Sequence, residues 1–200
     1  MNLSGIEKVK GFMPKHEGYA LFNWAEKFSD IGPIFEIGSY CGKSTLYLAN
    51  GASKNNQLVY TVDHHSGSEE HQLNEEYFDE DIYDFKEKRV NSFPLLIKNI
   101  NDHKMQNIVP IISDAYNLSS KWSAKLGMLF IDGGHSLESA MSDYNFWESK
   151  ILCNGALVIH DIYEKPEDGG QAPFEVYKKA LENNYKLYER VDTIVCLIKG

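Results

Sequence analysis

Short apolar runs alternate with helix-like stretches along most of the chain, and this alternation constrains the fold more than any other feature. The expected strands are Pro33–Gly38, Leu58–Asp63, Ile108–Ile112, Met128–Asp132, Ala156–Asp161, Lys186–Val191 and Thr193–Lys199. The expected helices are Tyr19–Phe28, Lys43–Asn50, Ser92–Asn101, Leu137–Lys150 and Pro173–Asn183. Most of the first five strands are apolar on both faces, as expected for strands that helices cover on each side. The pattern predicts βαβ units around a parallel sheet.

The last two expected strands differ, because only Asp192 separates them. Strands joined so tightly must pair antiparallel, with their ends lending residues to the turn. The predicted fold is therefore α/β: a doubly wound, mostly parallel seven-stranded sheet completed by a C-terminal antiparallel hairpin. We expect a single domain over residues 1–200, with an N-terminal helical segment at 1–30. Trp24 and Phe28 of that segment are expected to pack on the sheet or line the substrate site.

The formal charge of −9 is concentrated in one segment. Residues 64–85 contain 8 acidic residues and no Lys or Arg, which leaves 29 − 8 = 21 acids against 20 bases elsewhere. A charged segment is usually a solvated surface, and we keep that interpretation for most of these acids. The segment directly follows an expected strand and also carries four aromatic side chains, Tyr77, Phe78, Tyr83 and Phe85. We therefore interpret residues 64–85 as an acidic insert that forms a lid over a substrate pocket.

Composition excludes several classes of partner. A pI near 5.2 without a basic stripe argues against nucleic acid as the main ligand. The chain has no apolar run near the ~18 residues of a membrane helix, and its first residues lack a hydrophobic signal core. Three cysteines are too few for a disulfide framework. We expect a cytoplasmic protein without a membrane partner; the pattern leaves a homo-oligomer open.

Ligands of open parallel sheets bind beyond the carboxyl ends of the strands, and a glycine loop follows the first strand. Gly38 and Gly42 let the backbone turn tightly, and Ser44 lies in the first turn of a helix whose free N–H groups can meet an anion. An ordinary βα turn explains the glycine spacing alone equally well. The spacing is not the dinucleotide G-x-G-x-x-G, because Tyr40 takes the place of the second glycine.

Acidic residues follow the next two strands. Asp63 comes 25 residues after Gly38 and is placed to accept hydrogen bonds from a ribose diol. A solvated strand-end Asp is the plain alternative, but the glycine loop and the acid occur together. Asp114 and Ala115 follow the third strand, where they are placed to contact an adenine edge.

The pattern E-x-G-x-x-x-G-x-S, with the strand-end acids and the terminal hairpin, resembles the class I S-adenosylmethionine-dependent methyltransferases over roughly residues 30–200. The resemblance implies a Rossmann-like methyltransferase fold. It also implies that Asp63 holds the cofactor ribose, and that Asp114 and Ala115 hold the adenine. The residues that it places around the methionine end are Glu36, Gly38, Ser39, Gly42 and Ser44.

The ends of the fourth and fifth strands carry residues suited to methyl transfer. If these strands are neighbours, ~4.8 Å apart, Asp132 and Asp161 can share one cation, because close carboxylates repel unless positive charge bridges them. Two glycines after Asp132 let His135 return above the same pocket, where it can remove a proton from an acceptor hydroxyl. The alternatives are that each strand-end Asp only caps the following helix and that His135 is a plain loop residue. Strand alternation points His160 away from Asp161, so a structural His and a ligand are equally supported.

Residues 130–163 resemble the macrocin-type antibiotic and sugar O-methyltransferases and the related cephalosporin-hydroxylase-like proteins. In that group the aspartate matching Asp132 binds a divalent metal, usually Mg²⁺, with an acidic pair at the end of strand five. The resemblance implies that Asp132, next to the cofactor, and Asp161 bind metal and that His135 is the general base. His160 stands where the group has the first acid of the pair, and imidazole suits Zn²⁺, Fe²⁺ or Mn²⁺ better than Mg²⁺. Either the metal differs, or its coordination is weaker, or no metal binds.

The resulting hypothesis is an O-methyltransferase that uses S-adenosylmethionine, and a divalent metal such as Mg²⁺, Mn²⁺ or Zn²⁺, on a small hydroxylated metabolite. An NAD-dependent oxidoreductase and a non-catalytic cofactor-binding protein of the same fold are the alternatives. A second metal cluster at the start of the insert has no recognised ligand spacing. Its members would be His64, His65, Glu69, Glu70 and His71.

Overall fold

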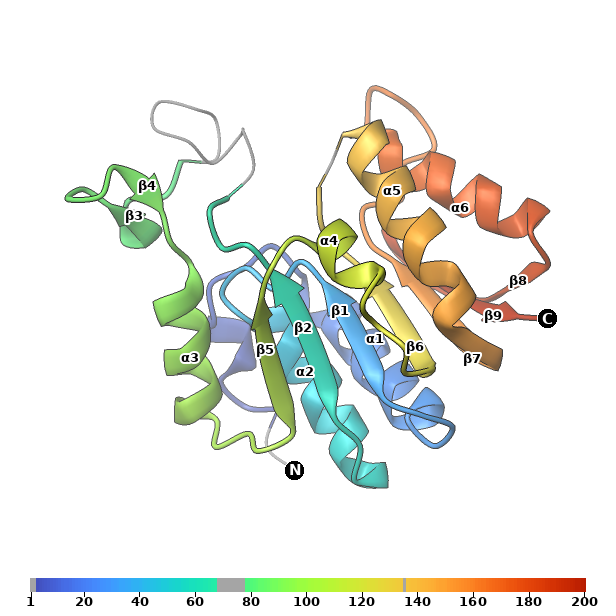
Figure 1. Cartoon of the computed structure of the whole chain (residues 1–200), viewed down its shortest axis with the longest axis horizontal. Coiled ribbons are helices and arrows are strands. Elements are labelled where there is room, and N and C mark those ends of the chain that lie inside the picture. Colours follow the sequence, from blue (N-terminus) through green and yellow to red (C-terminus); the bar gives the residue numbers. More distant parts are fainter. Residues whose placement is uncertain (1–2, 68–77, 135) are drawn as a thin grey trace.

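Seven strands form one sheet in the computed structural model, which describes residues 3–67, 78–134 and 136–200 (Figure 1). The strand order is β5–β2–β1–β6–β7–β9–β8. The strands are β1 (Ile34–Ile37), β2 (Val59–Asp63), β5 (Ile108–Ile112), β6 (Leu126–Ile131), β7 (Ile151–Ile159), β8 (Tyr185–Val191) and β9 (Ile194–Lys199). β5, β2, β1, β6 and β7 pair parallel, whereas β9 pairs antiparallel with both β7 and β8. The predicted sheet with its C-terminal hairpin is confirmed.

Helices cover both faces of this sheet (Figure 1). On one face, α1 (Lys15–Phe28) and α2 (Lys43–Ala52) share a buried apolar core with β1, β6, β7 and β9. On the other face, α5 (Leu137–Trp147) and α6 (Ala172–Glu182) bury a second core. The predicted packing of the N-terminal helix is confirmed, because Trp24 and Phe28 are buried in the first core.

Local sequence explains where several helices begin. α1 begins at Lys15, directly after Pro14 and four residues before the expected start at Tyr19. α2 begins after Gly42, which has a left-handed backbone conformation. Pro94 lies in the first turn of α3 (Phe93–Asp102), where a missing N–H is tolerated. Ser92 precedes α3 as predicted, but its side chain does not cap the helix. Its hydroxyl lies 2.8 Å from Nδ1 of His65 instead.

Two strands differ from expectation. β5 is covered less than the other parallel strands: its residues are only partly buried, and Ile112 is 60% exposed. β5 is the edge strand of the sheet, so it has a neighbour on one side only. β7 begins at Ile151 rather than Ala156, because Ile151 already pairs with Leu126 of β6 before an irregularity in the register.

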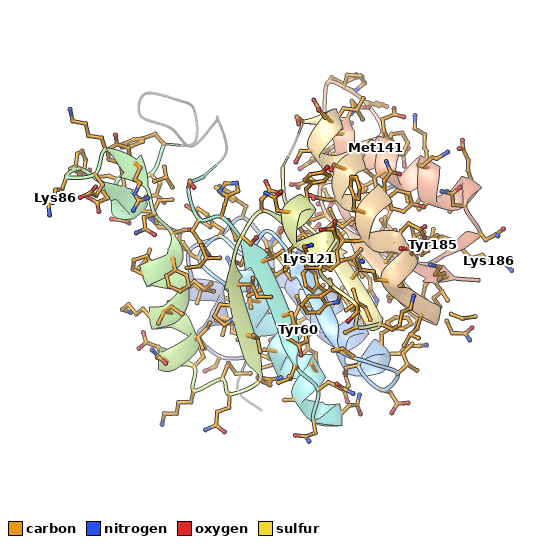
Figure 2. The ribbon with its side chains drawn as sticks, viewed as in Figure 1. Tyr60, Lys86, Lys121, Met141, Tyr185 and Lys186 are labelled. Carbon is orange, nitrogen blue, oxygen red and sulfur yellow. The ribbon has the colours of Figure 1, made fainter. Side chains whose placement is uncertain are left out.

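The structure also contains short elements that the pattern did not predict. A helix of five residues, α4, spans Ala115–Ser119, and 3-10 turns span η1 (Ile6–Lys8), η2 (Ser53–Asn55), η4 (Glu80–Ile82) and η5 (Glu148–Lys150). β3 (Tyr83–Asp84) and β4 (Arg89–Val90) form a small hairpin, with Lys86 at its far end from the sheet (Figure 2). No helix within the described ranges is long and apolar enough to cross a membrane.

Candidate active site

The glycine loop after β1 lies against the end of β6. Gly38 has φ of 89°, and a Cβ at this position would overlap the backbone carbonyl of Asp132. Gly42 has φ of 91°, and a Cβ there would meet the side chain of Leu96 from α3. Both positions therefore need glycine for its conformation and its lack of a side chain. The loop consequently sits beside Asp132, one of the predicted metal ligands.

Glu36 holds the start of α2 from beneath this loop. The side chain is fully buried, and its two oxygens accept hydrogen bonds from the hydroxyls of Ser44 and Thr45, each at 2.6 Å. Burial raises the pKa of Glu36 to about 7. The structure thus brings Glu36 and Ser44 together as hydrogen-bond partners of each other, and their place around the methionine end of a cofactor stays a prediction. Ser39 differs, because its buried hydroxyl has no hydrogen-bond partner among the described residues.

Asp63 ties the end of β2 to the glycine loop. Oδ2 accepts hydrogen bonds from the backbone N–H groups of Ser39 at 3.0 Å and Tyr40 at 2.8 Å. Oδ1 accepts a third from the N–H of His65 at 2.7 Å. The carboxylate therefore shapes the loop that is predicted to receive the cofactor.

The third strand end is also organised by a carboxylate. Asp114 caps α4, since its Oδ1 accepts hydrogen bonds from the backbone of Tyr116 and Asn117. The carbonyl of Ala115 accepts a hydrogen bond from the indole of Trp147 at 3.1 Å, which fastens this turn to α5. Asp114 and Ala115 follow the carboxyl end of β5, and Asp63 lies at the carboxyl end of the neighbouring strand β2.

Asp132, His160 and Asp161 come together where β6 and β7 end. The Nδ1 atom of His160 lies 3.0 Å from Oδ1 of Asp132 and 3.7 Å from Oδ2 of Asp161. The suggestion from strand alternation that His160 points away from Asp161 is wrong. β7 ends at Ile159, and Asp161 takes a left-handed backbone conformation with φ of 59°, so the alternation of an extended strand no longer applies.

A fourth residue, Glu17 of α1, completes this cluster. Its Oε2 atom lies 2.8 Å from Nε2 of His160, and its Oε1 accepts hydrogen bonds from the N–H and hydroxyl of Thr193. Glu17 is fully buried. Glu17 was not predicted, because the expected helix began at Tyr19 and left Glu17 outside it, whereas α1 begins at Lys15. The adjacent Gly18 was the available signal. A Cβ at Gly18 would overlap the ring of Tyr47, so α1 and α2 meet closely there.

The carboxylates around His160 determine its charge. Burial opposes a charged imidazole, but Asp132, Glu17 and Asp161 together raise the pKa of His160 well above its usual value. Burial likewise opposes ionisation of Glu17, yet hydrogen bonds from His160 and Thr193 lower its pKa. The cluster is thus a site of strong negative potential that attracts a proton or a metal cation.

Several other predicted residues are placed differently. His135, the predicted base, lies outside the described residues, as do Glu69, Glu70 and His71 of the suggested second cluster. His65 is buried against Ser92, and its backbone is bound to Asp63, which gives it a structural role. His64 is exposed.

The described part of the acidic insert is bound to the glycine loop after β1. Asp79 accepts hydrogen bonds from the hydroxyl of Tyr40 at 2.9 Å and from Lys10 at 2.7 Å. Ile82 and Val90 pack on Cys41 in a small buried cluster. Most of the acids were expected to face water, as Glu80 and Asp81 do; Asp79 instead pairs with a Lys and a Tyr from other segments.

The chain matches a known protein family and is similar in structure to several solved proteins. Residues 35–162, more than half of the chain, match the family model of a methyltransferase domain. The chain is similar in structure to the O-methyltransferase NovP, with 14% identity, a TM-score of 0.64 and coverage of 91% of this chain and 80% of that one. It is also similar to the O-methyltransferase TomG from Streptomyces achromogenes, solved with S-adenosylmethionine, at 11% identity, TM-score 0.62 and coverage of 94% and 82%.

A third similar structure is an rRNA methylase from Streptococcus thermophilus, at 16% identity, TM-score 0.59 and coverage of 94% of this chain and 99% of that one. These identities establish a shared fold and leave the methyl acceptor open, because one fold hosts many substrates. The family match covers the glycine loop, the strand-end acids and His160, but not Glu17. The chain belongs to the methyltransferase-domain family and is a class I S-adenosylmethionine-dependent methyltransferase.

Proposed function

We propose that the protein transfers a methyl group from S-adenosylmethionine to a hydroxyl of a small metabolite of the sugar or natural-product type. The observation that carries this proposal is the contact between Gly38 and Asp132, which joins the glycine loop to the His160 cluster. A cofactor seated on the loop would present its methyl group beside Asp132. Similarity to the O-methyltransferases NovP and TomG supports oxygen as the acceptor atom.

The residues of the glycine loop fit S-adenosylmethionine. The buried hydroxyl of Ser39 has no protein partner among the described residues, as expected for a group that meets a ligand. Gly38 and Gly42 give the loop its left-handed turns, and the start of α2 offers free N–H groups to the carboxylate of the methionine end. Asp63 would hold the ribose, and Asp114 with Ala115 would hold the adenine.

The donor set at the ends of β6 and β7 fits a divalent metal. Donor atoms that share one ion through bonds of about 2.1 Å lie about 3.0 to 3.5 Å apart. Nδ1 of His160 lies 3.0 Å from Asp132 and 3.7 Å from Asp161, close to that spacing. Asp132, His160 and Asp161 would hold the ion, and one imidazole with two carboxylates favours Mn²⁺ or Zn²⁺ over Mg²⁺.

When bound, S-adenosylmethionine supplies an electrophilic methyl group, and a divalent cation lowers the pKa of an acceptor hydroxyl. Asp132 and Asp161 orient that hydroxyl in line with the methyl group. His135 removes the hydroxyl proton in our proposal. Residues 64–85 cover the acceptor and exclude water, with Asp79 keeping the insert against the cofactor loop.

The remaining parts of the proposal concern the surroundings of the enzyme. We propose a small-molecule partner rather than nucleic acid or membrane, since the acidic insert would repel a phosphate backbone. A cytoplasmic location and a homo-oligomer stay predictions.

Calorimetry with S-adenosylmethionine, its demethylated product and NAD tests the cofactor directly. We expect both sulfur compounds to bind and NAD not to bind; binding of NAD without either sulfur compound would contradict the proposed cofactor. Mass spectrometry of reactions with a panel of sugars, phenols and aliphatic alcohols then tests the reaction. Cofactor binding without any demethylated product would support a non-catalytic binding protein.

A further inference from the structure

Glu17 lies behind the proposed metal site, on the opposite side of His160 from Asp132. Glutamate is almost never fully buried unless it is paired, and Glu17 is fully buried. Thr193 donates two hydrogen bonds to Oε1, from its backbone N–H at 2.8 Å and its hydroxyl at 2.7 Å. Oε2 lies 2.8 Å from Nε2 of His160. Three partners thus fix both oxygens of one carboxylate.

This arrangement selects which nitrogen of His160 faces the strand-end aspartates. In this structure both nitrogens of His160 face carboxylates, Nε2 toward Glu17 at 2.8 Å and Nδ1 toward Asp132 at 3.0 Å. Because an ionised carboxylate can only accept, each nitrogen carries an N–H. A cation held by Asp132 and Asp161 would replace the proton on Nδ1, while the Nε2–H would stay with Glu17.

We propose that Glu17 is a positioning residue, which holds the tautomer and ring orientation of His160 so that Nδ1 binds a divalent metal together with Asp132 and Asp161. The inference rests on the proposed metal-assisted function. Metal-binding histidines generally donate their second N–H to a carboxylate or carbonyl, and loss of that partner weakens metal affinity about 10- to 100-fold. Glu17 is such a partner, from a helix far from β7 in the sequence.

The packing of α1 explains how Glu17 reaches this position. Gly18 lies so close to Tyr47 of α2 that a side chain would overlap the ring. This close contact brings the first turn of α1 to the sheet end, between β7 and the β8–β9 turn. The amide of a glutamine at this position cannot replace the carboxylate of Glu17. Its single oxygen cannot accept hydrogen bonds from both Thr193 and His160, and its NH₂ group would face one of these donors.

Titration with Mn²⁺ at one fixed pH, followed by electron paramagnetic resonance of the free ion, tests the proposal on the full chain. We expect Glu17→Gln to weaken Mn²⁺ affinity about 10- to 100-fold. The matched control is His16→Gln, at the neighbouring position of α1, whose exposed ring pairs with Asp192 at 2.9 Å. Its Mn²⁺ affinity should stay within about twofold, which is below 0.5 kcal/mol.

A spectroscopic signature identifies the ligand itself. Pulsed electron paramagnetic resonance of the Mn²⁺ complex should show nitrogen modulation from an imidazole in the wild-type protein, and His160→Gln should abolish it. Wild-type Mn²⁺ binding without this modulation would overturn the inference. So would unchanged affinity in Glu17→Gln.

Thr193→Val keeps the test decisive if Glu17→Gln does not fold. This variant removes one hydrogen bond to Glu17 and keeps the backbone donor, so Mn²⁺ affinity should fall about threefold or more, and no fall contradicts the proposal. Calorimetry with S-adenosylmethionine separates the two levels of inference. If wild-type protein binds the cofactor but no Mn²⁺ or Zn²⁺, the role of Glu17 is refuted while methyl transfer stands.

Discussion

Asp63 holds the backbone of Tyr40: its Oδ2 accepts the Tyr40 N–H at 2.8 Å, across 23 residues of sequence. The same oxygen accepts from Ser39, and Oδ1 accepts from His65. An ionised carboxylate offers about four acceptor positions, so these three bonds leave room for a ribose hydroxyl. Asp63 can therefore shape the cofactor loop and bind the cofactor with one side chain.

Asp63→Asn should weaken S-adenosylmethionine binding about 10- to 100-fold and also lower the melting temperature. Hydrogen bonds to charged groups contribute about 1.5–3 kcal/mol, and the amide NH₂ would face backbone donors. Calorimetry and thermal unfolding measure the two effects. Asp102→Asn is the control, because its exposed pair with Lys98 contributes little. Weaker cofactor binding with an unchanged melting temperature would mean that Asp63 acts on the ribose alone.

His135→Ala should reduce kcat about 10²- to 10⁴-fold, because general base catalysis typically contributes that much. The affinity for S-adenosylmethionine should stay within about twofold, since the base acts on the acceptor hydroxyl. His103→Ala, at the end of α3, is the control. Equal turnover in His135→Ala and the wild type would refute the base assignment.

Asp143→Asn should stabilise the protein at high pH and have little effect at low pH. Burial, and then the Asp114 carboxylate, raise the pKa of Asp143 from 3.8 to about 7. The folded state therefore holds a proton that the unfolded state releases, so this group's stability is fully present below pH 3.8 and lost as pH rises through 7. Each pKa unit corresponds to about 1.4 kcal/mol, so a rise of about three units makes the gain at pH 8 up to about 4 kcal/mol.

Urea unfolding at pH 4 and pH 8 measures this difference for Asp143→Asn. The same change in unfolding free energy at both pH values would show that the protonation of Asp143 does not differ between the folded and unfolded states. Asp102→Asn, at an exposed position, again provides the control.

Asp79→Ala should release the acidic insert from the cofactor loop. The variant loses the hydrogen bonds from Tyr40 and Lys10, so backbone amides in residues 78–92 and in the loop should exchange hydrogen about tenfold faster. The acceptor KM should rise more than the Kd for the cofactor. Glu80→Ala removes the same charge from an exposed neighbour and should change neither. Equal effects of Asp79→Ala and Glu80→Ala would show that the insert is a charged surface without a role in acceptor binding.

The sequence predicted the strand-end residues well because a parallel sheet carries them to one edge. Asp63, Asp132 and Asp161 each follow an apolar strand, and that rule alone locates them. The glycine loop was equally predictable, since Gly38 adopts a left-handed conformation beside another backbone segment. These features depend on local chain geometry and on strand order.

The features that escaped prediction depend on contacts between distant segments. Glu17 becomes a buried acceptor only because His160 and Thr193 arrive from the other end of the chain. Asp161 lies beside His160 because the backbone leaves the extended conformation at Asp161, and the residue type there does not predict such a change. β3 and β4 have two residues each, too few for an alternating pattern.

The bond between Glu17 and Thr193 also sets an order of events during synthesis. Thr193 follows Glu17 by 176 residues, so at about 5–20 residues per second the ribosome needs roughly 10–35 s to supply the partner of this carboxylate. Until then α1 carries an acid on the face that it will bury. A nascent chain must therefore keep this face hydrated, or covered by a chaperone, and the His160 cluster can form only after nearly all of the sheet has left the ribosome.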